Sequence, residues 1–237
     1  MNAIDPSVHR ATVPRQVGGG RLGEAAYVEI KRRIISNEFS PNFQLTESQL
    51  AELLGMSRTP VHEALVALEK EGLIENIPRR GMRVLPVASK DMLEIYQVLT
   101  ALELSAIELI MARADVATVI AQLRSEVDAM NVALELASSG EAWTAADARF
   151  HRKFFELCGN KRLMQVGLSF REQVDRARTL TFPLRDKTVK SNAAHRELVD
   201  LMEKGDTAEA LARHKSHRVA VTQELTEILS RFQSLVL

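Results

Sequence analysis

Residues 45–65 read LTESQLAELLGMSRTPVHEAL, and this stretch decides the fold of the N-terminal part of the chain. Apolar side chains recur in it at helical spacing, at Leu50, Leu53, Leu54, Val61, Ala64 and Leu65. Gly55 supplies the positive φ that ends a helix, while Ser57 or Thr59 offers an N-cap for the next one. The stretch therefore predicts a helix-turn-helix, a motif whose second helix enters the major groove of DNA.

The residues that follow predict two short strands. Leu73–Ile77 and Met82–Leu85 are apolar-rich runs joined through Pro-Arg-Arg-Gly at positions 78–81. Such a hairpin forms a wing, and its tip carries Arg79 and Arg80 beside Gly81. Cationic side chains next to a glycine suit contact with a phosphate or a narrow minor groove. On charge alone, an arginine pair in a turn is more often a solvated surface.

At this point the chain resembles the GntR family of bacterial transcription regulators. The resemblance rests on Ser57–Leu65, on Glu71-Gly72-Leu73 and on the Arg-Gly wing, and it fixes residue types over about forty positions. It implies a homodimer that binds double-stranded DNA with an inverted-repeat operator. Arg58 is expected to read base edges and Arg80 to enter the minor groove. We predict DNA contacts from Lys31, Ser57, Arg58, Thr59, His62, Arg79, Arg80 and Gly81.

One position departs from the family pattern, because His62 stands where relatives usually carry arginine. Since an imidazole changes charge near neutral pH, DNA binding through His62 would depend on pH. Lys31 belongs to a Lys-Arg-Arg run at positions 31–33 that either lies along the phosphates or forms an ordinary solvated helix face.

The composition of the chain restricts the class of protein to which it can belong. The 237 residues are 46% hydrophobic and have a formal net charge of zero, so any affinity for nucleic acid must come from local clusters. The only cysteine, Cys158, excludes an intrachain disulfide and suits a reducing compartment. No apolar run approaches a membrane span, and no signal-peptide core is present. We expect a cytoplasmic protein that does not bind a membrane.

Three regions follow from the pattern. Residues 1–22 are polar, contain a glycine triplet and predict a disordered tail; residues 23–88 predict the winged helix-turn-helix. Residues 89–237 show no strand signal and predict an all-α bundle, with helices near 89–114, 116–138, 141–158, 161–180, 187–204 and 206–233. The expected fold class is mainly α.

Chemistry in the bundle concentrates on three helices. Asp147 and His151 share a face with Phe154 and Cys158, and the aromatic neighbour indicates that this face points inward. His195 lies among apolar residues on a later helix, and His214 and His217 do so on the last one. An aspartate and histidines that converge in a bundle core are ligands suited to zinc, nickel, manganese or iron. Each histidine by itself is more often a structural core residue.

With a GntR-like N-terminus, this bundle resembles the FadR-like branch, whose ligand-sensing part is called the FCD domain. Metal-binding FCD domains look like Asp-x-x-x-His, a histidine on a later helix, and a third after a Gly-Asp turn. Asp147, His151, His195 and His217 match those positions, whereas His214 fits the spacing less well. The resemblance implies one divalent metal ion per chain, zinc first among the candidates, and a small organic acid as effector.

Further effector contacts are expected from Arg149, Arg171, Arg178 and Asn192. Many relatives carry a pocket arginine near the second turn of the first bundle helix, where this chain has Leu99. Two other classes of function remain open at this stage. One is a metal-dependent hydrolase, although no general base is evident beside the ligands; the other is a helical interaction module with structural histidines.

Overall fold

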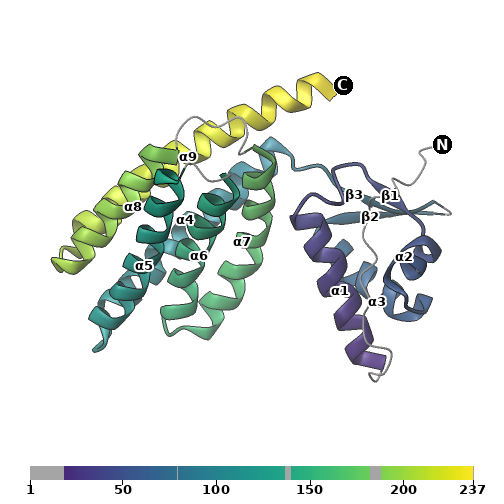
Figure 1. Ribbon diagram of the computed structural model, residues 1–237, viewed down its shortest axis with the longest axis horizontal. Coiled ribbons are helices and arrows are strands. Elements are labelled where there is room, and N and C mark those ends of the chain that lie inside the picture. Colours follow the sequence, from purple (N-terminus) through teal and green to yellow (C-terminus); the bar gives the residue numbers. More distant parts are fainter. Residues whose placement is uncertain (1–18, 79, 137–139, 182–187, 237) are drawn as a thin grey trace. The chain divides into compact units, whose positions relative to one another are not determined.

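The computed structural model describes residues 19–78, 80–136, 140–181 and 188–236. Contacts within the chain divide it into two units, one ending at Pro86 and the other beginning at Val87 (Figure 1). We call them the N-terminal unit and the helical unit. The division falls two residues before the expected boundary at Ala88. Residues 1–18 of the expected tail, and Arg79, lie outside the described residues.

The described part of the N-terminal unit combines three helices with a small sheet. Its elements are α1 (Gly19–Ile35), β1 (Gln44–Leu45), α2 (Glu47–Leu54), α3 (Arg58–Lys70), β2 (Ile74–Ile77) and β3 (Gly81–Val84). The strands are antiparallel in the order β1-β3-β2, and Ile77 pairs with Gly81 at the tip of the β2–β3 hairpin. Helix α1 packs along α3. The predicted helix-turn-helix and wing are confirmed.

Short-range hydrogen bonds explain where α2 begins and ends. The Thr46 hydroxyl accepts from the backbone N–H of Gln49 at 3.3 Å, and the Gln49 side chain accepts from the backbone N–H of Thr46 at 2.9 Å. Gly55 ends the helix with φ 65°, as predicted. Ser57 is the N-cap residue of α3, but its side chain makes no capping hydrogen bond, and Thr59 lies inside the helix.

Two features of this unit differ from the sequence prediction. Strand β1 has two residues, too few to give an alternating pattern, and only its pairing with β3 defines it. Helix α1 begins at Gly19, so residues 19–22 of the predicted tail are helical. The glycines at its start weaken the sequence signal without preventing the helix.

The helical unit consists, among its described residues, of six helices. They are α4 (Ser89–Met111), α5 (Val116–Glu135), α6 (Gly140–Leu157), α7 (Lys161–Thr181), α8 (Thr188–Glu203) and α9 (Thr207–Val236). Helix α4 packs on α9, α7 and α6, while α5 packs on α6 and α8. This arrangement confirms the predicted all-α bundle, and none of the described helices is long and apolar enough to cross a membrane.

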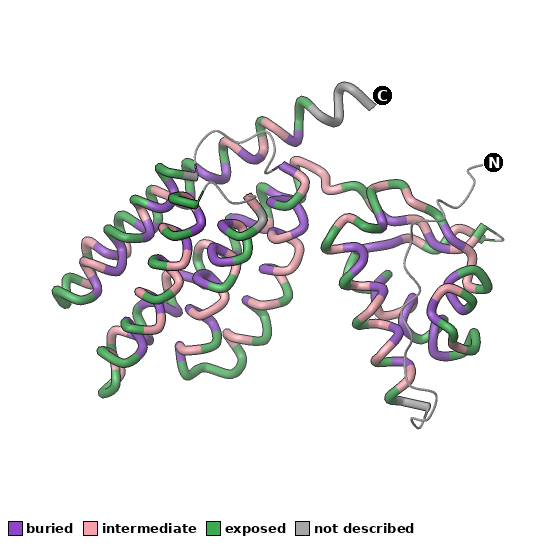
Figure 2. Tube along the Cα trace, in the orientation of Figure 1, coloured by how far each residue is buried: buried purple, intermediate pink, exposed green. Residues whose placement is uncertain are grey.

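Each unit has a hydrophobic core of its own, and buried residues follow the inward faces of its elements (Figure 2). In the helical unit, hydrogen bonds also join the first residue of α4 to the C-terminal half of α9. We call these hydrogen bonds the clip. The Ser89 hydroxyl donates to the carbonyl of Thr226 at 3.0 Å, and the Ser230 hydroxyl donates to Ser89 at 2.8 Å. The clip fastens the first turn of α4, close to where the helical unit begins.

Candidate metal centre and nucleic-acid interface

The first turns of α3 present the predicted base-reading residues to solvent. Ser57, Arg58, Thr59 and His62 are all exposed, while Pro60 and Val61 between them are buried. The same helix start holds backbone N–H groups that suit a phosphate. Four predicted contact residues thus share one accessible surface of the N-terminal unit.

His62 is paired across the two helices of the motif. Its Nδ1 lies 2.7 Å from Oε1 of Glu47, at the start of α2, and this hydrogen bond raises the pKa of His62 above its usual value. The imidazolium and the carboxylate together carry no net charge. Deprotonating His62 leaves Glu47 as a net negative charge on the surface that would face DNA.

The wing is built tightly around Gly81. Its φ of 87° favours glycine, and an added Cβ would lie 2.3 Å from the carbonyl oxygen of Leu45. Arg80, at the tip, is exposed, whereas Arg83 on β3 forms an ion pair with Glu75 on β2. Of the arginine pair, only Arg80 belongs to the described residues.

The basic run of α1 does not present free charge. Lys31 lies 2.8 Å from Glu71 and donates to the Tyr27 hydroxyl at 2.7 Å, and its side chain is 14% exposed. The arginines that follow it are both paired with Glu29 and Glu38. The expectation that Lys31 lies along the phosphates is therefore not favoured, because its ammonium is already neutralised within the unit.

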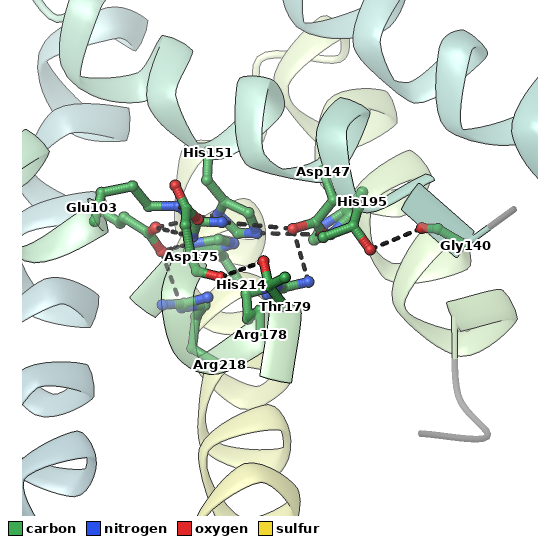
Figure 3. A network of polar contacts seen from close by, with 12 residues as sticks. Glu103, Gly140, Asp147, His151, Asp175, Arg178, Thr179, His195, His214 and Arg218 are labelled. Atoms are coloured by element: carbon green, nitrogen blue, oxygen red, sulfur yellow. Dashed lines mark hydrogen bonds and ion pairs between the residues drawn. The ribbon is translucent and has the colours of Figure 1, made fainter. Parts of the chain in front are cut away.

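At the centre of the helical unit, the structure brings together three of the four predicted metal ligands. Asp147 and His151 come from α6 and His195 from α8; all three are buried, and one ligand atom from each lies within 4.8 Å of the others (Figure 3). Asp147 Oδ1 is 3.0 Å from His195 Nε2 and 3.9 Å from His151 Nε2. The i, i+4 spacing on α6 places the first two on one face.

The two histidines of α9 occupy different places. His217 packs perpendicular to His195, with ring centroids 5.0 Å apart, and is mostly buried. His214 lies instead beside Glu103 of α4, with its Nε2 3.0 Å from Oε2 of that carboxylate. His217 thus borders the cluster of Asp147 and His195, whereas His214 belongs to a second cluster formed with Glu103 and His151.

The sequence analysis missed Glu103, although a signal for it exists. It stands on the apolar stripe of α4, at helical spacing with other buried residues, namely Tyr96, Leu99, Ala106, Ile107 and Ile110. An acidic residue on such a stripe requires a partner. Its partners include Arg218 of α9, whose Nε is 3.0 Å from Oε2.

Buried arginines balance the carboxylates. Arg178 lies 2.7 Å from Asp147 Oδ2, and Arg171 lies 3.5 Å from the same oxygen and 2.9 Å from Asp175. Burial alone would raise the pKa of Asp147, but Arg178 and the hydrogen bond from His195 outweigh it and hold that pKa well below its usual value. Glu103 is kept ionised in the same way, chiefly by Arg218.

Burial has the opposite effect on the imidazoles. It lowers the pKa of His151 and His195 and brings that of His217 to about 2. These rings are neutral at pH 7, which is the form that binds a metal. Both ring nitrogens of His151, and Nδ1 of His195, have no hydrogen-bond partner among the described residues. Neutral, buried and unpartnered nitrogens beside a carboxylate fit the requirements of a zinc-type cation.

Of the predicted effector contacts, Arg171 and Arg178 reach this centre and the other two do not. Arg149 is half exposed and pairs with Glu126 at 2.8 Å, because two residues beyond Asp147 a helix points away from the core. Its side chain therefore does not contribute to this buried centre. Asn192 bonds to Asn131 at 2.5 Å and lines a surface hollow between α5 and α8.

Comparison with known proteins agrees with this picture. Residues 22–84 match the bacterial regulatory proteins of the gntR family, and residues 94–220 match the FCD domain. An HTH-type transcriptional regulator from the TAR-I ttuE-ttuC' intergenic region of Agrobacterium vitis is 44% identical over 56% of this chain and 77% of its own. The Nta operon transcriptional regulator of Aminobacter aminovorans is 30% identical, over 64% and 70%.

A solved structure shares the fold. That of E. coli McbR/YncC has a TM-score of 0.69 at 19% identity and covers 86% of this chain and 97% of that one. The matched families and the named relatives are regulators of transcription, which sets aside the hydrolase alternative.

Proposed function

Because the chain belongs to the GntR family of transcription regulators and carries an FCD domain, we propose that a metal centre in its helical unit controls how tightly it binds DNA. In this proposal a homodimer binds an inverted-repeat operator in the cytoplasm. A small organic acid at the metal is the effector. The protein is a DNA-binding regulator and not an enzyme.

The exposed first turns of α3 and the wing support the DNA-binding part. Arg58 and His62 are one helical turn apart on α3, so both can face one groove. Arg80 at the wing tip is exposed and suits the adjacent minor groove. Two-fold symmetry of the protein requires two-fold symmetry of the operator.

One observation carries the metal part: Asp147, His151 and His195 meet in the core with their ligand atoms within 4.8 Å. Burying the imidazole nitrogens of His151 and His195 that have no hydrogen-bond partner among the described residues is costly unless a ligand satisfies them. We assign His217 as the fourth ligand, since its ring packs on His195 from the next helix. Such a centre binds a divalent cation, zinc first among the candidates, and the cation supplies a Lewis-acidic position for a carboxylate oxygen.

Buried guanidinium groups support an anionic effector. Arg171 and Arg178 contact Asp147 and lie beside the proposed metal. Many relatives carry an arginine where this chain has Leu99, which is buried in the core. The fixed positive charge beside the proposed metal comes from α7 instead. An organic acid is therefore recognised from α7 as well as through the metal.

Control of DNA binding then requires two states of the protein with different operator affinity. An effector that binds one of them more tightly shifts the population by its differential free energy, and DNA has the reciprocal effect on the effector. The ligand residues come from α6, α8 and α9, so the effector acts on how these helices pack.

Metal analysis of protein purified without a histidine tag tests the proposal. We expect one zinc-type ion per chain, and we expect His195→Ala and His217→Ala to lose it together with the effect of organic acids on operator binding. His62→Ala is the matched control for metal content alone, because it removes a histidine that lies outside the bundle. A stoichiometry near zero, or an unchanged response after the metal is stripped, contradicts the proposal.

A further inference from the structure

His151 stands between two buried carboxylates, one at each ring nitrogen. Its Nδ1 is 3.1 Å from Glu103 Oε1, and its Nε2 is 3.9 Å from Asp147 Oδ1 (Figure 3). The first separation has hydrogen-bond length, although the ring meets Glu103 out of alignment and neither nitrogen makes a well-formed bond among the described residues. Which nitrogen carries the proton decides which one is able to bind a metal.

The two carboxylates differ in how their oxygens are engaged. Oε2 of Glu103 receives His214 Nε2 and Arg218 Nε, each at 3.0 Å, while Oε1 faces His151 and lies 3.9 Å from Arg171. Only the Oδ2 atom of Asp147 contacts the arginines, and its Oδ1 atom faces histidine nitrogens alone. The two carboxylates therefore differ in the charge beside these oxygens: Glu103 Oε1 has the guanidinium of Arg171 3.9 Å away, whereas Asp147 Oδ1 faces imidazole nitrogens only.

We propose that Glu103 is a positioning residue of the metal centre: it accepts the Nδ1–H of His151 and thereby directs the lone pair of Nε2 toward Asp147 and His195. This inference rests on the metal proposed above. Ligating histidines commonly give their other N–H to a carboxylate, which fixes the tautomer and makes the ligand nitrogen more basic.

The surroundings of Glu103 suit this role better than a role as a second cation site. Arg218 contacts its carboxylate and has its guanidinium 4.8 Å from the centroid of the Tyr96 ring. A divalent cation at Glu103 would lie against this buried positive charge and that of Arg171. The contacts of Arg218 and His214 instead hold Glu103 still, so that α9 supports a residue of α4, which in turn orients a residue of α6.

Metal affinity of the full-length protein, measured by competition with a chelator, tests the inference. We expect Glu103→Gln to weaken the binding of Zn²⁺ and Co²⁺ by about 10–100-fold and to alter the Co²⁺ absorption spectrum. Glu126→Gln is the matched control, because Glu126 is a carboxylate of the same bundle whose ion pairs among the described residues are with Arg149 and Lys153. It should leave the affinity within about threefold of the wild type.

A double-mutant cycle separates positioning from a merely structural role. In a His151→Ala background, Glu103→Gln should cost little further affinity, because the nitrogen that it orients is gone. An equal loss with and without His151 would show that Glu103 acts by holding the fold, and would overturn the inference.

The remaining outcomes distinguish this inference from the function on which it rests. If the wild type binds no metal, the proposed function fails and takes the role of Glu103 with it. If the wild type binds metal and Glu103→Gln binds it equally well, only the role of Glu103 fails. Two ions per wild-type chain, with one of them lost in Glu103→Gln, would make Glu103 a ligand and overturn the positioning role.

Discussion

At the scale of single residues, Arg58 carries the strongest prediction about base reading. It is the first residue of α3, its side chain is exposed, and it forms no ion pair with another described residue. We expect Arg58→Ala to weaken operator binding by about 1–3 kcal/mol and to reduce the preference for operator over scrambled DNA. Arg21→Ala, which removes an equally exposed arginine from α1, is the control for loss of charge alone. Unchanged discrimination in Arg58→Ala would show that Arg58 reads no base.

We expect His62 to make DNA binding depend on pH. Because Glu47 raises its pKa, the stabilising pair between them is complete below the unfolded value of about 6.5 and is lost as pH rises through the higher folded value. We expect operator affinity to fall over that same window, since deprotonation leaves Glu47 as a net negative charge facing phosphate. Affinity titrations between pH 6 and pH 9, at fixed salt, measure this change.

Two variants locate the effect in the pair. The His62→Arg variant should keep its operator affinity at high pH, so that its affinity no longer depends on pH. In the Glu47→Gln variant, the pH at which operator affinity falls should move down toward 6.5. A wild-type profile without a step in this range would remove His62 from the account of DNA binding.

The residues of the metal centre were predictable to the extent that they follow local spacing. Asp147 and His151 lie one turn apart on an apolar face, and the sequence therefore placed both in the core, as observed. Glu103 depends on partners more than a hundred positions away, at His214 and Arg218, which no local pattern reveals. Arg149 is close to Asp147 in sequence, but it lies on an exposed face of α6 and pairs with Glu126.

At the scale of elements, the wing depends on Gly81. In Gly81→Ala the added methyl group meets the backbone of Leu45 and Thr46 in addition to the strain of a positive φ. We expect it to lower the unfolding temperature of the N-terminal unit and to weaken operator binding more than Gly72→Ala does. Gly72 is the matched control, with a φ of 70° and no atom within 4 Å of the added methyl. Calorimetry and DNA binding measure the difference, and equal effects of the two variants would show that contact with β1 does not matter.

Helices were the most predictable elements, because each carries a continuous apolar stripe and most of the turns between them contain a glycine or proline. The six helices of the helical unit lie where the sequence placed them, within a few residues at each end. Strand β1 was not predictable, because it exists only through hydrogen bonds to β3. The prediction that a hydroxyl side chain caps α3 was wrong, because the Ser57 side chain makes no capping hydrogen bond.

At the scale of the whole molecule, the two units have separate hydrophobic cores, and we expect their stabilities to respond separately to metal. The two hydrophobic clusters share no residue, so each unit has its own source of stability. A metal present at about a hundred times its dissociation constant should stabilise the helical unit by about 2.7 kcal/mol, because it binds only the folded form. Calorimetry of the full chain should show one transition that moves with metal and one that does not. A shift of both together would mean that the units unfold as one.

The clip between α9 and Ser89 gives the last helix a mechanical role. Thr226 follows His217 by nine residues, which is about 14 Å along a helix axis. A helix transmits displacement along its axis like a stiff rod. If α9 slides at the histidines, we expect the displacement to reach Ser89, which lies three positions beyond the division between the two units. The hydroxyl of Ser89 is then where we expect such a motion to act on the segment of chain that leads to the N-terminal unit.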